Sequence, residues 1–167
     1  MIRVLAMLAG LAGALTLSQF PEFSQQYRQR LSGAVNELRL VVVGFDTAAA
    51  AAGQSREEAL AAMGARGFEG QLKDTFTRSI RRYERLNADL AALRGASPLK
   101  RLARPWNMAD AELVRATWAE FRPAVPATTD GALSAGIGYL GGWAAVVFGL
   151  AALRRVFRRR KVAGARA

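Results

Sequence analysis

Side chains able to do acid–base, nucleophilic or metal chemistry are scarce in this chain. Its 167 residues include no His and no Cys, which excludes imidazole bases, thiolate nucleophiles, disulfides and His/Cys zinc sites. The adjacent Glu57 and Glu58 would point about 100° apart on a helix, so they suit a helix N-terminus better than an acid–base pair. The sequence around Ser134 does not match the G-x-S-x-G motif of a nucleophile elbow, because Ala132 stands where the first glycine is needed. We therefore predict a non-enzymatic protein with no catalytic, metal or cofactor site.

Most of the charged residues are Arg, and the excess of basic over acidic residues lies at the C-terminal end. All but three of the 24 basic residues are Arg, and the formal net charge is +11. All 13 acidic residues lie between Glu22 and Asp130, whereas residues 154–167 carry seven basic residues and no acid. A basic run directly after an uncharged stretch is typical of the cytoplasmic flank of a membrane span, where it contacts anionic lipid headgroups. We interpret the tail in this way, and not as a nucleic-acid site; its first six bases are Arg154, Arg155, Arg158, Arg159, Arg160 and Lys161.

Two uncharged segments are candidates for membrane spans. Residues 131–153 form 23 uncharged positions, which as a helix reach about 34 Å and can cross the hydrocarbon core. Val4–Phe20 is a shorter uncharged run behind Arg3, and it fits either a retained span over residues 1–20 or a cleaved signal peptide. Retention is favoured because a cut near Ala14 would leave an apolar core of only about ten residues.

Both segments carry small residues at helical spacing. Such ridges let two helices approach closely, either within the chain or against a neighbouring subunit. Neither segment contains an ionisable residue, which argues against transport by this chain alone. The residues that form the predicted ridges are Ala6, Gly10 and Ala14 in the first segment and Ser134, Gly138, Gly142 and Gly149 in the second.

Two spans and a basic tail predict a topology. The tail places the C-terminus in the cytoplasm, and an even number of crossings returns the N-terminus to the same side. Residues 21–130 would then face the periplasm of a bacterial inner-membrane protein.

The region between the spans has strong helical signals. Apolar periodicity and capping patterns predict helices over about 22–52, 56–64, 69–94 and 108–122. The third predicted helix has a coiled-coil-like seam, which packs either on the first as an antiparallel hairpin or on another protomer. The predicted fold class is therefore an all-α membrane protein in which two transmembrane helices flank an extracytoplasmic helical hairpin. The seam consists of Leu72, Phe76, Tyr83, Leu86, Leu90 and Leu93.

Two features of this region suggest contacts with other molecules. Four arginines on the third predicted helix, away from the seam, form either a solvated face or a docking site for an acidic partner. The last predicted helix, capped by Asn107 with Asp110 three residues on, has an aromatic face that either packs on the hairpin or lies, with Trp106, in the outer headgroup layer. The four arginines are Arg78, Arg81, Arg82 and Arg85.

The stretch from Ser18 to Tyr27, SQFPEFSQQY, resembles the opening of a family of small bacterial membrane proteins of unknown function. The run Arg82–Leu86 and the late apolar segment with its basic tail extend this resemblance over nearly the whole chain. The resemblance implies a bacterial inner-membrane protein and assigns no activity or catalytic residue.

These observations favour a scaffold, acting as an accessory or assembly subunit of a larger inner-membrane complex. The alternative is a self-assembling homo-oligomer that organises membrane or lipid. In either case the expected partners are membrane lipids and a membrane protein or a second copy of the chain, with no nucleic acid.

Overall fold

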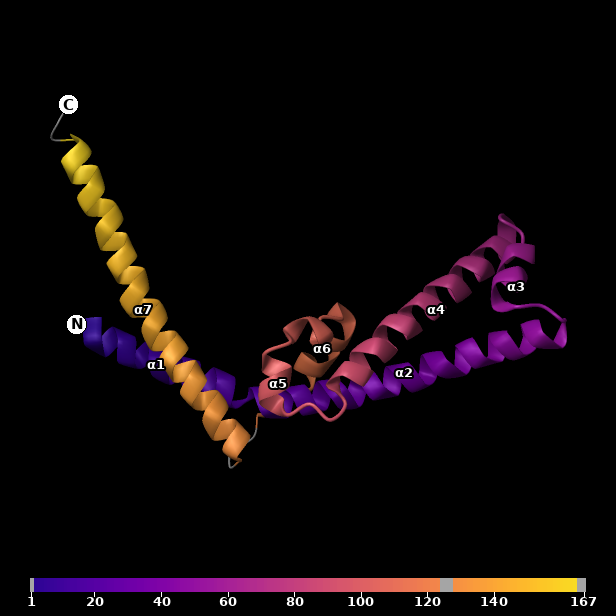
Figure 1. The fold of residues 1–167 in the computed structure, drawn as a ribbon, viewed down its shortest axis with the longest axis horizontal. Coiled ribbons are helices and arrows are strands. Elements are labelled where there is room, and N and C mark those ends of the chain that lie inside the picture. The colour runs from indigo at the N-terminus through magenta and orange to yellow at the C-terminus, as the bar shows by residue number, and fades with distance from the viewer. Residues whose placement is uncertain (1, 124–127, 165–167) are drawn as a thin grey trace. The chain divides into compact units, whose positions relative to one another are not determined.

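The computed structural model describes residues 2–123 and 128–164, and the regular elements within these ranges are all helical (Figure 1). The side chains of Arg154 and of residues 156–164 lie outside the described part. The chain divides into two compact units, one of residues 1–24 with 122–167 and the other of residues 25–121. We call the first the span unit and the second the hairpin unit.

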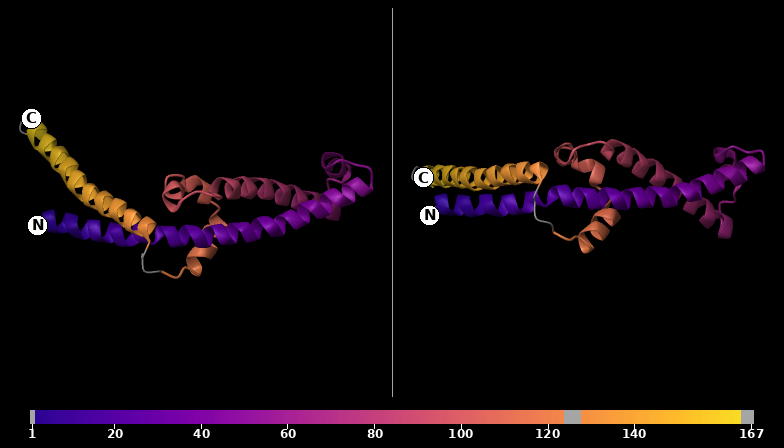
Figure 2. Two further views of the ribbon diagram at one scale, coloured as in Figure 1. Left: turned by 60° about the horizontal axis from the view of Figure 1, so that its bottom comes forward. Right: turned by 90° about the horizontal axis from the view of Figure 1, so that it is seen from below.

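The span unit is built from α1 (Ile2–Ser18) and α7 (Thr129–Gly164), which run in opposite directions and cross (Figures 1 and 2). α7 continues past residue 153, the predicted end of the second span. Its sequence contains no Pro after Thr129, and Arg and Lys are good helix formers, so nothing local ends the helix at the basic residues.

The first apolar helix is interrupted close to Pro21. α1 ends at Ser18 and α2 (Phe20–Ala51) begins two residues later. Proline has no N–H to donate to the carbonyl four residues earlier, and the backbone N–H of Phe23 bonds to the Gln19 carbonyl at 3.0 Å. Pro21 therefore lies in the first turn of a new helix, which is where prolines are tolerated.

Two helical stretches, Ile2–Ala51 and Thr129–Leu153, are long and apolar enough to cross a membrane. In their most apolar windows only 17% and 6% of the residues are buried inside the protein. The core helix of a soluble protein would be mostly buried, so both stretches need an apolar surrounding outside the chain.

In the hairpin unit, α2 and α4 (Gly67–Leu93) run in opposite directions and cross, joined through α3 (Arg56–Ala62) (Figures 1 and 2). The rings of Phe45 in α2 and Phe76 in α4 pack at 4.7 Å between centroids. Both helices carry buried apolar residues: Tyr27, Leu31, Val35, Val42 and Ala49 on α2, at steps of four and seven, and Ile80, Leu86, Leu90 and Leu93 on α4.

The buried face of α4 differs in part from the predicted seam. Ile80 is buried although it lies outside the heptad positions, and Leu72, Phe76 and Tyr83 are only half-buried. A straight helix has 3.6 residues per turn and drifts away from a strict seven-residue repeat. The buried positions therefore pass from one heptad column to the next along α4.

The ends of these helices follow local sequence signals. The predicted capping box is present in α3, because the Glu58 N–H donates to Ser55 Oγ at 3.2 Å and the Ser55 N–H donates to Glu58 Oε2 at 2.7 Å. Gly53 and Gly95 follow α2 and α4 with φ of +71° and +70°, a conformation that other residues rarely adopt.

The segment after α4 differs from the single predicted helix 108–122. It contains α5 (Pro98–Leu102), a 3₁₀ turn η1 (Pro105–Met108) and α6 (Ala111–Ala119). The predicted cap at Asn107 is wrong: Asp110 caps α6, and its side chain accepts a hydrogen bond from the Leu113 N–H at 3.1 Å. Leu113 and Thr117 are the buried face of α6.

Candidate functional site

Glycines bring α1 and α7 into backbone contact in the span unit. A Cβ built on Gly138 would overlap the carbonyl oxygen of Gly13, and one built on Gly142 would overlap the carbonyl oxygen of Ala9. A Cβ on Gly10 would come within 2.8 Å of the ring of Tyr139. The absence of these side chains is thus what allows the two helices to approach.

The predicted ridge residues take different places around this contact. Ala6 and Ser134 are fully buried, and Gly10 and Gly138 are buried as well. Ala14 is half-buried, and the closest backbone approach on α1 is made by Gly13, which the four-residue spacing missed. Gly149 faces open space and lies outside the contact, because its partner in an antiparallel pair would fall near or beyond the start of α1.

In the hairpin unit, two of the four predicted arginines meet the acidic start of α6. Asp110 accepts from Arg85 at 3.1 Å and from Arg82 at 3.4 Å, and Glu112 pairs with Arg82 at 2.6 Å. The Asp110 side chain is only 7% exposed, whereas that of Glu112 is 73% exposed. We call these four residues the Asp110 cluster; it ties α4 to α6.

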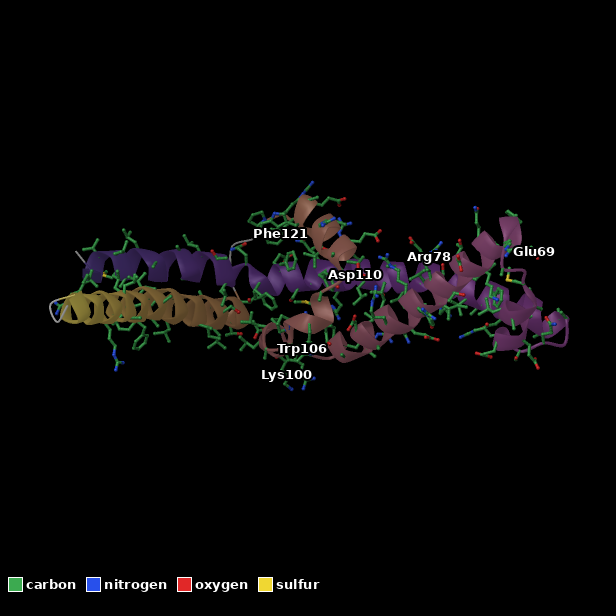
Figure 3. The ribbon with its side chains drawn as sticks, turned by 90° about the horizontal axis from the view of Figure 1, so that it is seen from above. Glu69, Arg78, Lys100, Trp106, Asp110 and Phe121 are labelled. Carbon is green, nitrogen blue, oxygen red and sulfur yellow. The ribbon has the colours of Figure 1, made fainter. Side chains whose placement is uncertain are left out.

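The other predicted basic residues do not join this cluster. Arg78 and Arg81 are exposed, and Arg78 donates to Thr75 Oγ1 at 3.3 Å (Figure 3). Arg155 of the tail is exposed, and the side chains of Arg154, Arg158, Arg159, Arg160 and Lys161 lie outside the described part.

Two groups with raised pKa values lie next to the Asp110 cluster, the buried Tyr27 and the half-buried Asp89. Burial raises the pKa of Tyr27 to about 12, so its hydroxyl stays protonated at neutral pH. Burial also raises the pKa of Asp89, with the nearby charge of Arg85 acting in the opposite sense. The arrangement holds helices together.

Ion pairs of Arg56 join α2, α3 and α4. The Arg56 guanidinium donates to both carboxylate oxygens of Asp46, at 2.7 and 2.5 Å, and reaches Glu84 at 3.6 Å. The hydrogen bonds from Arg56 hold the pKa of Asp46 below its usual value. This pair therefore stabilises the fold above the ordinary pKa of an aspartate, and the contribution is lost as the pH falls through the lowered pKa.

We expect Asp46→Asn to loosen α3 at neutral pH, and its effect to shrink as the pH falls through the lowered pKa of Asp46. The Asp46 side chain is 38% exposed, so solvent screening limits the loss to about 0.5–1 kcal/mol. Hydrogen exchange of the α3 amides, in a series from pH 7 downward, measures the effect. Glu37→Gln, which replaces an exposed carboxylate on α2, is the control. An equal loss at every pH of the series would contradict the assignment of this stability to the Asp46 charge.

The described residues also form a shallow groove and no metal cluster. Within the described residues no group of three or more acidic side chains converges as metal ligands would. A groove of about 610 Å3 lies between α2, α4 and α6, with Gly33, Leu38 and Val41 on one wall and Leu113 and Ala116 on the other.

The helical fold and the two apolar helices define an all-α membrane protein with two candidate membrane-spanning helices. The chain belongs to the family described as "Protein of unknown function (DUF2937)", which matches residues 1–159. No curated protein and no solved structure matches the chain significantly. The family supplies no activity and no site residue.

Proposed function

We propose that this protein is a non-enzymatic membrane scaffold that serves as an accessory or assembly subunit of a larger bacterial inner-membrane complex. In this proposal the tail is cytoplasmic, the N-terminus lies on the same side, and the hairpin unit faces the periplasm, because the basic residues concentrate after the second span.

One surface of α2 carries the proposal. Leu40 and Val43 are exposed on the same face of the helix, and Gly33 and Gly44 lie on that face with open space where a Cβ would be. A glycine inside a helix costs about 0.5–1 kcal/mol relative to alanine, and neither glycine is needed by a contact within the chain. We call these four residues the α2 stripe.

The α2 stripe has the properties of a helix-docking surface. Exposed apolar residues grouped on one face are typical of protein-interaction sites, and glycines let a second backbone approach closely. The ion pairs of the Asp110 cluster and of Asp46 with Arg56 brace the helices on which this surface is displayed. An exposed apolar surface on braced helices supports a binding role.

We expect gentle detergent extraction of the tagged protein, at native expression, to yield a stoichiometric membrane-protein companion on sizing and mass spectrometry. Leu40→Gln should remove the companion from the sized fraction, because it places a polar group at the centre of the α2 stripe. Arg39→Gln, an exposed neighbour about 100° away on the helix, is the matched control and should retain it.

Two results would contradict the accessory-subunit proposal. A pure homo-oligomer that Leu40→Gln dissociates would assign the stripe to a second copy, which is the self-assembling alternative. A companion that survives Leu40→Gln as well as Arg39→Gln would show that the stripe is not the binding surface.

A further inference from the structure

A second exposed surface, on α6, differs from the α2 stripe in composition. Leu113 and Thr117 of α6 are buried, whereas Trp118 is 69% exposed and its ring stacks on Phe121 at 5.9 Å, with an interplanar angle of 11°. Trp118 lies about 100° from Thr117 around the helix, so burial of one face leaves Trp118 on another. Phe121 follows the end of α6 and is half-buried. Exposing a large aromatic surface to water is unfavourable in free energy, unless a lipid phase or another molecule covers that surface.

The charges around this aromatic pair favour an anionic surface. Arg115 is exposed and lies three residues before Trp118, on the same side of α6. The three carboxylates of the segment are held elsewhere: Asp110 and Glu112 pair with Arg82, and Glu120 pairs with Arg30 of α2. The surface that remains combines aromatic rings with a cation, which is typical of segments that lie in lipid headgroups.

The position of α6 in the chain points to the same occupant. The pair of Glu120 with Arg30 holds the end of α6 beside the early turns of α2, ten residues after Phe20. α7 begins eight residues after Phe121. Figure 3 shows Trp106 and Phe121 at one end of the hairpin unit, with Glu69 at the other. Both connections to the apolar helices therefore leave the hairpin unit near the aromatic pair.

We propose that Trp118 of α6 and Phe121, two residues after its end, bind the lipid headgroup layer and anchor the hairpin unit to the membrane surface. The occupant is lipid because the surface is aromatic and basic, and because the chain next enters an apolar span. Aromatic rings of this kind occupy the region between the hydrocarbon core and water.

Depth-dependent fluorescence quenching tests this anchor in the full-length protein. In one variant Trp118 is the only tryptophan, after Trp106→Phe and Trp143→Phe. A second variant replaces all three tryptophans by Phe and carries Phe68→Trp, at a position 78% exposed near the start of α4. Both are reconstituted in vesicles of phosphatidylcholine and phosphatidylglycerol that contain lipids brominated at shallow or deep acyl positions.

We expect shallow bromines to quench Trp118 more than deep ones, with a blue-shifted emission, and to leave the Phe68→Trp variant unquenched. A variant with Trp143 alone, in α7, should be quenched by deep bromines and so reports correct insertion. Quenching of Trp118 no stronger than that of Phe68→Trp would overturn the anchor. Trp118 unquenched in lipid, yet shielded from iodide in native membranes, would also overturn it and assign the surface to a protein partner.

Discussion

Replacing Gly138 by Ala is expected to separate α1 from α7. The new Cβ would overlap the Gly13 carbonyl oxygen, which is backbone and cannot move without shifting the whole helix. Inserting one methyl group into a closely packed contact costs about 1–3 kcal/mol. In a membrane, helices associate mainly through close packing, because no water is released when they meet. A loss of close packing therefore weakens their association directly.

The same helix supplies matched controls. Gly136 and Gly141 both face open space, so Gly136→Ala and Gly141→Ala add the same methyl group without meeting another atom within 4 Å. Alanine forms helices better than glycine by up to about 1 kcal/mol, so these variants should be neutral or slightly more stable. Gly138→Ala should therefore destabilise the helix pair, whereas Gly136→Ala and Gly141→Ala, within one helix turn of it, should not.

The measurement follows the distance between α1 and α7 during an SDS titration. The chain has no Cys, so Leu8→Cys and Leu140→Cys, both at exposed positions, can carry a donor and an acceptor dye. Gly138→Ala should lose energy transfer at a lower SDS fraction than the parent, and the two controls should not. If all three glycine variants behave alike, the backbone contact does not hold the helices together.

The local features of this fold could be predicted from the sequence. The uncharged runs indicated both apolar helices, and Ser55 with Glu58 indicated the start of α3, since each depends only on residues that are close in the chain. The small-residue spacing pointed to Gly138 and Gly142, but it selected Ala14 on α1, whereas Gly13 makes the contact. Spacing identifies the face of a helix, and the crossing geometry decides which residue on that face meets the partner.

The Asp110 cluster could not be predicted in this way. Asp110 lies 25 residues from Arg85 and 28 from Arg82, and a local pattern carries no information on such pairs. Asp110 was interpreted as support for a cap at Asn107, although its own side chain caps α6. The four arginines read as a uniform stripe, yet α6 covers only the side with Arg82 and Arg85 and leaves Arg78 and Arg81 in solvent.

Replacing Asp110 by Ala is expected to detach α6 from α4. The variant removes the N-cap of α6, worth about 0.5–2 kcal/mol, and the shared carboxylate of two ion pairs. Breaking a buried pair costs about 3–5 kcal/mol, but Arg82 and Arg85 are 33% and 63% exposed and can be rehydrated. We therefore expect a total loss of about 2–4 kcal/mol.

Two further variants separate the cap from the charge. Asp110→Asn keeps an oxygen for the Leu113 N–H, because asparagine caps helices as well as aspartate does, and loses only the charge. Its expected cost is about 1–2 kcal/mol. Glu112→Gln breaks a pair with the same Arg82, but the Glu112 side chain is 73% exposed, so it should cost less than about 1 kcal/mol.

Hydrogen exchange of the α6 amides, in the full-length protein in detergent, measures these differences. Protection should fall most in Asp110→Ala, less in Asp110→Asn and least in Glu112→Gln, since the order follows the burial of the carboxylate and the loss of its hydrogen bond to the backbone. Equal protection in Asp110→Ala and Glu112→Gln would mean that Asp110 does not hold α6 in place. The order of the three variants therefore distinguishes two ways of holding α6, the helix that precedes the second apolar helix: the polar contacts of Asp110 or apolar packing.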